Sequence, residues 1–239
     1  MALTFSTTSG DSEDRGVKVL VHAPAGYGKT VLCGTLPEPI ILSAEAGLLS
    51  LRPENQVRLF GASREIPVIV IKSIKDLEEA FKFITESRDA AHFQSVALDS
   101  VTEMGEVALA AMKRQFKDGR QAYGEYNERM TACIRAFRDI PNKHVYFAAK
   151  QTRMPGETDE LTRFGPMMPS KALQENLPHF FDEVFAMCIS PRQADGSTYR
   201  YLRTQPDLNF FAKDRSGSLD EIEQPNLTSV INKIKPTQT

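Results

Sequence analysis

The chain has 239 residues, 41% of them hydrophobic, which is enough for one substantial core and leaves little room for a second full domain. Its formal net charge is −2, so the overall charge does not indicate a nucleic-acid-binding protein, and any such surface must be a local patch. Three widely spaced cysteines without metal-ligand spacing argue against a disulfide framework and a zinc site.

The first 16 residues are small, polar and charged, and therefore predict an arm outside the core. They contain no basic segment followed by an apolar stretch, so we expect no signal peptide. No apolar run approaches the roughly 18 residues that a membrane-spanning helix needs. We therefore expect a cytoplasmic protein with no membrane partner.

From residue 17 onward, apolar runs alternate with helical patterns. Buried strands are predicted by the runs at 17–22, 39–42, 66–71, 95–99 and 145–149. Ser73, with Asp76 three residues on, predicts the start of an amphipathic helix that reaches Ile84. A further helix, ended by Pro141, carries one apolar face that consists of Tyr126, Met130, Cys133, Ile134 and Phe137. This alternation predicts an α/β fold with a mostly parallel central sheet flanked by helices.

The C-terminal part of the chain predicts antiparallel strands at the end of the sheet. A short helix from residue 172 is expected to end at Pro178, and strands are expected at 182–189, 198–203 and 209–212. From residue 216 the chain is polar and acidic, and its last predicted element is a short helix at about 227–234. We therefore divide the chain into an N-terminal arm (1–16), a core (17–215) and a polar tail with a short helix (216–239).

Residues 23–30 carry the strongest functional signal. Their sequence, APAGYGKT, fits the phosphate-binding loop of P-loop proteins, except that alanine replaces the first glycine. The glycines let backbone N–H groups surround phosphates, the lysine reaches the β- and γ-oxygens, and the threonine offers a hydroxyl to magnesium. The alternative is an ordinary glycine-rich turn. The predicted cofactors are ATP and Mg²⁺, bound by Ala23, Pro24, Ala25, Gly26, Tyr27, Gly28, Lys29 and Thr30.

Three polar side chains lie at or just beyond the ends of predicted strands. Asp99 closes the run SVALD and is the predicted second magnesium ligand, with a helix N-cap as the alternative. Glu45 follows the strand at 39–42 and either activates the attacking water or is a solvated loop residue. Gln151 follows the strand at 145–149, where it would contact the γ-phosphate and report hydrolysis to the next loop.

Two segments have the composition of a surface for single-stranded nucleic acid. The first, KRQFKDGRQAY, combines basic and aromatic residues, and its candidate contacts are Lys113, Arg114, Lys117, Arg120 and Tyr123. A solvated helix face is the alternative. The second is a long predicted loop at 152–170, and its candidate contacts are Arg153, Arg163 and Phe164. The four histidines share no spacing typical of metal binding or catalysis, so we assign them structural roles.

The order of these motifs resembles the RecA-like recombinase core. The series APAGYGKT, ILSAEAGLL, SVALDSVTEM and VYFAAKQTR precedes a long loop, and with the phrase NFFAKDRSGSLDE it covers roughly residues 17–220. Within that family it is similar to the compact phage-type single-strand annealing ATPases. The resemblance implies that Glu45 activates water, Asp99 serves magnesium and Gln151 senses the γ-phosphate. It also implies that residues 113–124 and 152–170 are DNA-binding loops.

The resemblance further implies an assembly. Cations in the region of Lys213 and Arg215 reach the γ-phosphate of the adjacent subunit in RecA-like assemblies, although here they have acidic neighbours as alternative partners. Phe5 on the arm either inserts into a neighbouring subunit or is exposed. A single-stranded DNA-binding protein is a further implied partner, and a phage-encoded protein would act in the cytoplasm of a bacterial host.

We therefore expect an ATPase that binds single-stranded DNA as an ATP-dependent homo-oligomer, a ring or a filament, and promotes annealing or recombination. Two alternatives stay open. One is a DNA-coating scaffold that ATP locks without turnover. The other is a small-molecule P-loop kinase, in which residues 113–124 would form a lid over the phosphates.

Overall fold

The computed structural model describes residues 15–45, 47–155 and 162–236, so Phe5 lies outside the described residues. Its centre is a ten-stranded sheet with the hydrogen-bonded order β10-β8-β7-β1-β5-β4-β2-β3, in which β6 also pairs with β5 and β9 with β7. The strands are β1 (Lys18–Ala23), β2 (Pro39–Ser43), β3 (Val68–Val70), β4 (Ser95–Asp99), β5 (His144–Pro155), β6 (Thr162–Pro166), β7 (Glu183–Ile189), β8 (Arg200–Arg203), β9 (Lys213–Asp214) and β10 (Ile222–Glu223).

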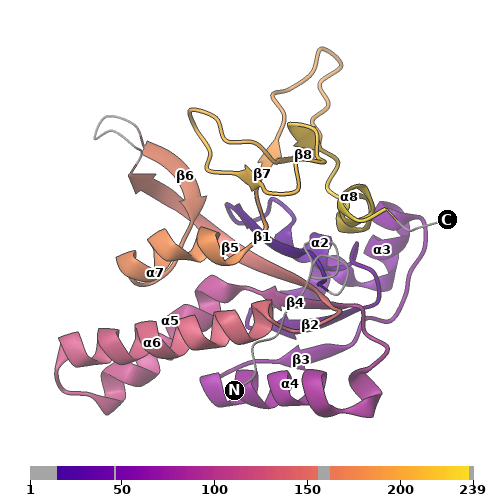
Figure 1. The fold of residues 1–239 in the computed structure, drawn as a ribbon. Coiled ribbons are helices and arrows are strands. Elements are labelled where there is room, and N and C mark those ends of the chain that lie inside the picture. Colours follow the sequence, from indigo (N-terminus) through magenta and orange to yellow (C-terminus); the bar gives the residue numbers. More distant parts are fainter. Residues whose placement is uncertain (1–14, 46, 156–161, 237–239) are drawn as a thin grey trace, which may run out of the picture.

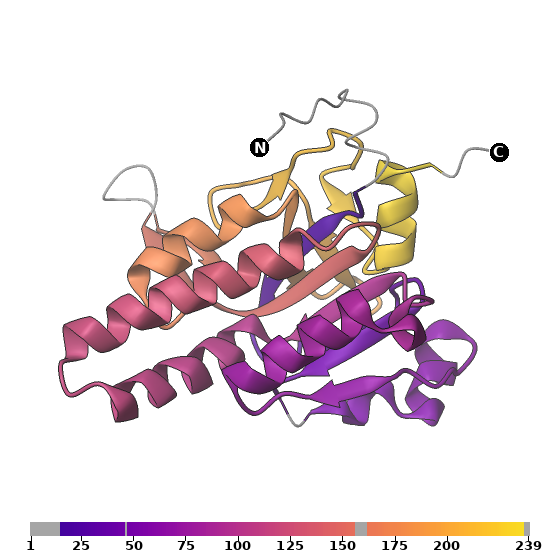
Figure 2. The same ribbon diagram turned by 60° about the horizontal axis from the view of Figure 1, so that its bottom comes forward.

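The pairing confirms the predicted mixed sheet. Neighbouring strands are parallel from β7 through β1, β5, β4 and β2 to β3. The strands β8, β9 and β10, from the C-terminal part of the chain, pair antiparallel. The parallel strands β1, β2 and β4 are buried along their whole length, because helices cover both faces of the sheet (Figures 1 and 2).

The helices form two layers. One face of the sheet packs against α4, α5 and α6, and the other against α2, α3 and α8. Along β1, Leu20 belongs to the first core while Val19 and Val21 belong to the second, as the alternation of side chains in a strand requires. The helices are α2 (Lys29–Cys33), α3 (Pro53–Phe60), α4 (Ile74–Glu86), α5 (Val101–Gln115), α6 (Gly119–Arg138), α7 (Lys171–Asn176) and α8 (Leu227–Ile234).

The predicted start of α4 is confirmed. Ser73 precedes the helix with extended backbone, and its Oγ accepts a hydrogen bond from the Asp76 backbone N–H over 3.1 Å. The predicted apolar face of α6 is also present, since Tyr126, Ile134 and Phe137 are buried against the sheet. None of the helices in the described part of the chain is long and apolar enough to cross a membrane.

Among the described residues of the segment 152–170, which was expected to be a loop, most belong to two paired strands of a β5–β6 hairpin. β5 continues to Pro155, and β6 pairs with it antiparallel from Gln151 opposite Pro166 to Pro155 opposite Thr162. Backbone hydrogen bonds hold these two strands together, and the segment contains no continuous apolar run from which strands could be predicted. The expected strand at 209–212 is also wrong, because only Phe210 forms an isolated bridge, to Phe164, and the regular strand is β9.

The segment 216–236 packs onto the core. β10 extends the sheet beside β8, and α8 buries Leu227, Val230 and Ile231. The Leu227 backbone N–H donates a hydrogen bond to Thr35 Oγ1 over 2.9 Å. This contact ties the C-terminal helix to the residues that follow α2.

Candidate nucleotide-binding site

The carboxyl ends of three parallel strands bring the main predicted site residues together. β1 runs into the loop 24–28, β4 ends at Asp99, and β2 leads through Ser43 to Glu45. Ser43 lies opposite Asp99 in the β2–β4 register, and the Glu45 backbone N–H donates a hydrogen bond to the Asp99 backbone oxygen over 3.2 Å. In α/β sheets this edge is where ligands bind.

The loop between β1 and α2 depends on its two glycines. Gly26 has φ of 78° and Gly28 has φ of 112°, in the left-handed region where side chains other than hydrogen are strained. At Gly28 a Cβ atom would also lie 3.0 Å from the Met187 methyl carbon. The glycines of APAGYGKT are therefore required by the path of the backbone itself.

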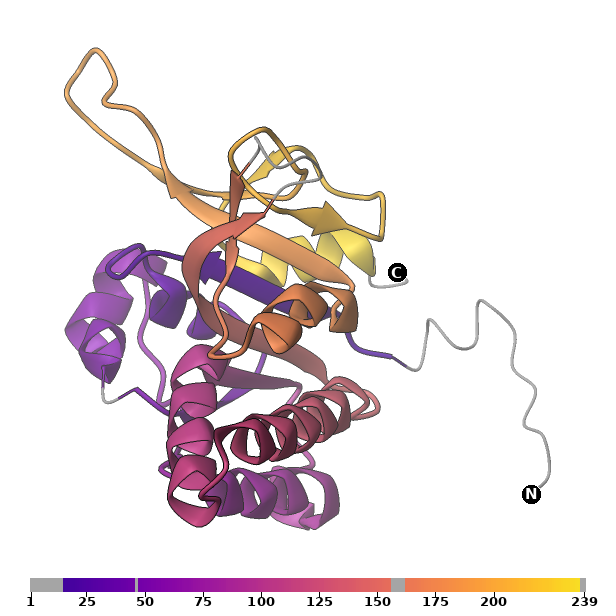
Figure 3. The same cartoon turned by 90° about the vertical axis from the view of Figure 1, so that its left-hand side faces the viewer.

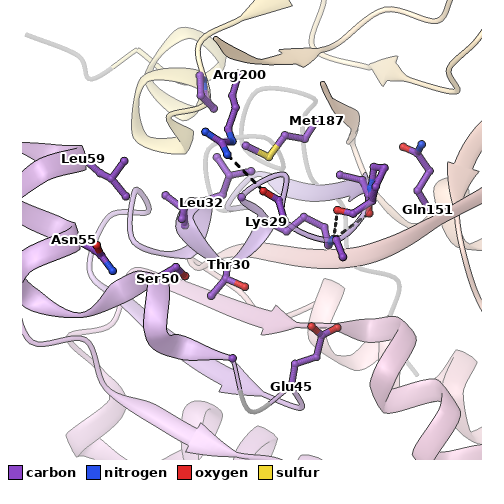
Figure 4. A pocket seen from close by; sticks show the side chains of 18 of the residues that line it. Lys29, Thr30, Leu32, Glu45, Ser50, Asn55, Leu59, Gln151, Met187 and Arg200 are labelled. Carbon is purple, nitrogen blue, oxygen red and sulfur yellow. Dashed lines mark hydrogen bonds between the residues drawn. The ribbon is translucent and has the colours of Figure 1, made fainter. Parts of the chain in front are cut away.

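Lys29 begins α2 and lines a cavity of about 890 Å³ (Figure 4). Its Nζ donates hydrogen bonds to the backbone oxygens of Ala23 (2.9 Å) and Pro24 (3.1 Å). Burial lowers the pKa of Lys29, while the carboxylates of Glu45 and Asp99 act in the opposite direction. The lysine is thus held at the loop with its charge facing two acids.

Thr30 and Asp99, the two predicted magnesium ligands, are in direct contact. The Thr30 hydroxyl donates a hydrogen bond to Asp99 Oδ2 over 2.6 Å. Asp99 is 2% exposed, and its other oxygen, Oδ1, is buried without a hydrogen-bond partner. Burial raises the pKa of Asp99, and the Thr30 hydrogen bond opposes that rise. A buried, unpartnered carboxylate oxygen beside a hydroxyl is the kind of oxygen donor that Mg²⁺ prefers, so these residues fit the metal that the fold implies.

Glu45 is positioned by a residue that sequence analysis did not identify. The Ser100 hydroxyl donates a hydrogen bond to Glu45 Oε1 over 2.5 Å, and Ser100 directly follows Asp99. Glu45 also lines the cavity that contains Lys29. The predicted water-activating carboxylate and the predicted metal ligand are therefore linked through adjacent residues at the end of β4.

Gln151 lines the cavity from β5, and a buried histidine holds it. The Gln151 amide lies with its Oε1 position 3.0 Å from His22 Nδ1, and His22 Nε2 lies 2.8 Å from the Phe211 backbone oxygen. His22 is fully buried in β1, two residues before the loop 24–28 begins. The sequence predicts only a structural role for His22, and it does not reveal these partners because they come from distant parts of the chain.

Lys213 and Arg215 lie outside this cavity. Lys213 Nζ donates hydrogen bonds to the backbone oxygens of Pro178 (2.8 Å) and Phe181 (2.5 Å), and Arg215 forms an ion pair with Asp182 at 3.3 Å. β9, which contains Lys213, pairs with the start of β7, at the end of the sheet opposite the phosphate loop. Their action across a subunit interface stays a prediction.

The basic residues of the first predicted DNA segment surround the turn of a helical hairpin. Lys113 and Arg114 lie in the last turn of α5, Lys117 in the link and Arg120 at the start of α6. Lys113 Nζ lies 5.0 Å from the centre of the Tyr123 ring. The α5–α6 hairpin projects from the same side of the molecule as the β5–β6 hairpin (Figures 1 and 2).

The second predicted DNA segment carries stacked aromatic and basic groups. Arg153 on β5 lies opposite Phe164 on β6, and its guanidinium lies 5.6 Å from the centre of the Phe164 ring. Phe164 also packs against Phe210, with ring centres 5.7 Å apart. Arg163, beside Phe164, has a buried Nε without a hydrogen-bond partner. Figure 3 shows this hairpin and the α5–α6 hairpin from the side on which both project.

Arg200 is a cavity residue that the sequence did not reveal. It begins β8, and its Nε donates a hydrogen bond to the Tyr27 backbone oxygen over 2.8 Å (Figure 4). Tyr199 precedes it and lines the same cavity, as does Arg58 on α3. No motif marks these residues, because the pairing of β7 with β8 and the packing of α3 bring them to the loop.

The sequence profile of the AAA domain family matches residues 15–216. The chain belongs to this family. Among solved structures, the RadB recombinase is similar in fold, with 16% identity over 88% of this chain and 91% of that protein and a TM-score of 0.51. A KaiC-like protein from Pyrococcus horikoshii matches 79% of this chain and 77% of that protein at 13% identity, with a TM-score of 0.42. No curated protein sequence matches the chain.

The family match places the chain among proteins with a P-loop NTPase fold. The matched range of 15–216 contains the phosphate loop, Asp99 and Gln151. The predicted α/β architecture is shared with the RadB recombinase. The finer resemblance, to phage-type annealing proteins, stays a prediction.

Proposed function

We propose that this protein is an ATPase that binds single-stranded DNA as an ATP-dependent homo-oligomer and promotes annealing or recombination. The observation that carries the proposal is that Lys29, Thr30 and Glu45 line one cavity together with the glycine loop, while the buried Asp99 accepts a hydrogen bond from Thr30. Two smaller cavities, one beside Lys18 and one beside Gly34, have no residue of the loop 23–30 in their walls.

ATP would lie with its phosphates on the loop 23–30. Lys29 would turn from the backbone oxygens of Ala23 and Pro24 to the phosphate oxygens, which are stronger acceptors because they are charged. Thr30 and Asp99 would hold Mg²⁺, which neutralises charge on the β- and γ-oxygens. The remaining cavity, between α3 and the start of β8, has room for the nucleoside, with Tyr199 and Arg200 on one wall.

Hydrolysis would depend on Glu45. Its carboxylate is fixed by Ser100 on one oxygen, and it borders the cavity near Lys29 and Asp99. A carboxylate placed there orients and deprotonates a water that attacks the γ-phosphate. Lys150 also lines this cavity, and Glu103 and Glu106 bind its ammonium group at 2.8 Å and 3.1 Å.

Single-stranded DNA would bind along the side from which the two hairpins project. The α5–α6 hairpin would supply cations for the phosphates, and the β5–β6 hairpin would supply the Phe164 ring for base stacking. Gln151 joins the two functions, because it lines the nucleotide cavity and lies at the base of the β5–β6 hairpin. The fold shared with the RadB recombinase is consistent with this arrangement.

The alternatives make different predictions. In a small-molecule kinase, residues 113–124 would close over the phosphates, but none of these residues lines the cavity. A scaffold without turnover would bind ATP and DNA and release no phosphate. Steady-state phosphate release should therefore be measured with and without single-stranded DNA. We expect DNA to stimulate release and Glu45→Gln to abolish it; release that is absent from the wild type would favour the scaffold.

A further inference from the structure

His22 bonds at both ring nitrogens and connects the nucleotide cavity with the β5–β6 hairpin. Its Nδ1 lies 3.0 Å from the Gln151 amide, and its Nε2 lies 2.8 Å from the Phe211 backbone oxygen. The imidazole is fully buried, so water does not satisfy either nitrogen. Each ring nitrogen therefore depends on its one protein partner.

The partners of the ring fix where its proton lies. A backbone oxygen only accepts hydrogen bonds, so Nε2 carries the proton and donates it to Phe211. Burial lowers the pKa of His22, and the ring is neutral at pH 7. Nδ1 is then an acceptor, and its neighbour Gln151 must turn its amide nitrogen toward it. In that orientation the amide oxygen of Gln151 does not bond to His22 and can accept a hydrogen bond from a group in the cavity.

The hydrogen bonds continue from Phe211 into the hairpin. The Phe211 backbone N–H donates to the Phe164 oxygen over 2.8 Å, and the Phe164 N–H donates to the Asn209 oxygen over 2.6 Å. Phe164 is the residue whose ring stacks with Arg153. A continuous set of hydrogen bonds therefore runs from a cavity-lining amide through one imidazole to the backbone of Phe164 in the hairpin.

We propose that His22 is a positioning residue that orients the Gln151 amide and couples nucleotide binding to the β5–β6 hairpin. This inference rests on the proposed function, because it assigns to His22 the coupling between ATP and DNA. A phosphate that draws the Gln151 nitrogen away leaves Nδ1 without a donor in a buried position. The imidazole then has to shift, and with it the segment around Phe211 and Phe164.

Two substitutions separate the two ends of this link. In His22→Gln the new amide reaches the position of Nε2 and retains a partner for Phe211, whereas in His22→Asn it reaches the position of Nδ1 and retains a partner for Gln151. His92→Asn, at an exposed histidine, is the matched control. The affinity for a labelled single-stranded oligonucleotide is measured with and without ATP and Mg²⁺, and ATP affinity is measured separately.

We expect ATP to strengthen DNA binding of the wild type and of the control by about 5- to 150-fold, the usual range of allosteric coupling. Both His22 variants should bind ATP as the wild type does and lose this gain. A role in packing alone predicts lower melting temperatures with the gain intact, and that result in either variant overturns the inference. A wild type that binds ATP and DNA without any gain also overturns it.

A spectroscopic measurement keeps the inference testable if the variants do not fold. In wild-type protein with ¹⁵N-labelled histidine, His22 should carry its proton on Nε2 at pH 7, and ATP with Mg²⁺ should change the Nδ1 chemical shift. Gln151→Leu should change the same shift without nucleotide. A proton on Nδ1, or an Nδ1 shift that responds to neither change, contradicts the proposal. Failure of the wild type to bind ATP at all instead refutes the proposed function.

Discussion

Replacing Thr30 by valine removes one hydroxyl and should affect both stability and metal binding. The Thr30 hydroxyl is the hydrogen-bond donor to the buried Asp99 side chain, whose other oxygen has no partner. A hydrogen bond to a charged group contributes about 1.5–3 kcal/mol. We therefore expect the free energy of unfolding of Thr30→Val to fall by about 2 kcal/mol, which for a domain of this size lowers the melting temperature by about 4–8 °C. The difference in free energy of unfolding between Thr30→Val and the wild type should decrease at low pH, because protonation of Asp99 removes the charge that strengthens this hydrogen bond.

Thr30→Ser is the matched control, because it keeps the hydroxyl. Melting temperatures of both variants are compared without nucleotide and then with ATP and Mg²⁺. A ligand at 100 times its Kd stabilises a protein by about 2.7 kcal/mol. The serine variant should show this magnesium-dependent increase and the valine variant should lose most of it. Equal melting temperatures without nucleotide, or an equal gain with it, would refute the assignment of Thr30 and Asp99 as a coupled metal pair.

Four further predictions follow from other parts of the molecule. Lys29→Ala should abolish ATP-dependent DNA binding in a gel-shift assay, whereas Glu45→Gln should keep ATP bound and prolong the DNA complex. If ATP hydrolysis is unchanged in the Glu45→Gln variant, Glu45 is not the catalytic base. Alanine at the four basic residues of the α5–α6 hairpin should reduce the log–log salt slope of DNA binding by roughly 0.7 per lost phosphate contact, and a parental slope would mean a solvated face. A variant with alanine at both Lys213 and Arg215 should regain activity when it is mixed with Lys29→Ala protein. Because Lys213 also donates hydrogen bonds to two backbone oxygens, Arg215→Ala alone is the cleaner test. Mixtures that cross-link but stay inactive would exclude action across a subunit interface. Burial lowers the pKa of His144 from 6.5 to about 4. The free energy of unfolding should therefore be unaffected by this group above pH 6.5 and should fall by about 3 kcal/mol as the pH decreases toward 4. Melting curves of His144→Asn should lack this loss, and a pH profile identical to that of the wild type would contradict the prediction.

Most of the fold was predictable because its core strands are continuous apolar runs. The sequence runs of β1, β4 and the first half of β5 are almost entirely apolar, and their few polar residues are buried. They could therefore be predicted as central strands. The helix that follows Ser73 could also be predicted, since its N-cap residue and its apolar face indicate the same start. The β5–β6 hairpin was not, because pairing between Gln151 and Pro166 depends on backbone hydrogen bonds that leave no apolar period.

The site divides in the same way. Lys29, Thr30 and Asp99 could be predicted because their chemistry requires fixed residues at fixed places along one strand-loop-helix unit and at a neighbouring strand end. His22 and Arg200 could not, because each acts through residues more than a hundred positions away. Their roles exist only once the sheet places β1 beside β5 and β8 beside β7.

ATP bound at residues 23–30 should enable the protein to hold single-stranded DNA, and fluorescence anisotropy of a labelled oligonucleotide measures this dependence. The oligonucleotide is titrated with wild-type protein and with Lys29→Ala protein, each with ATP and Mg²⁺, with ADP and Mg²⁺, and without nucleotide. We expect tight binding only for the wild type with ATP, and we expect this binding to weaken as salt is added. Equal anisotropy curves for the wild type in all three conditions, or for Lys29→Ala and the wild type with ATP, would contradict it.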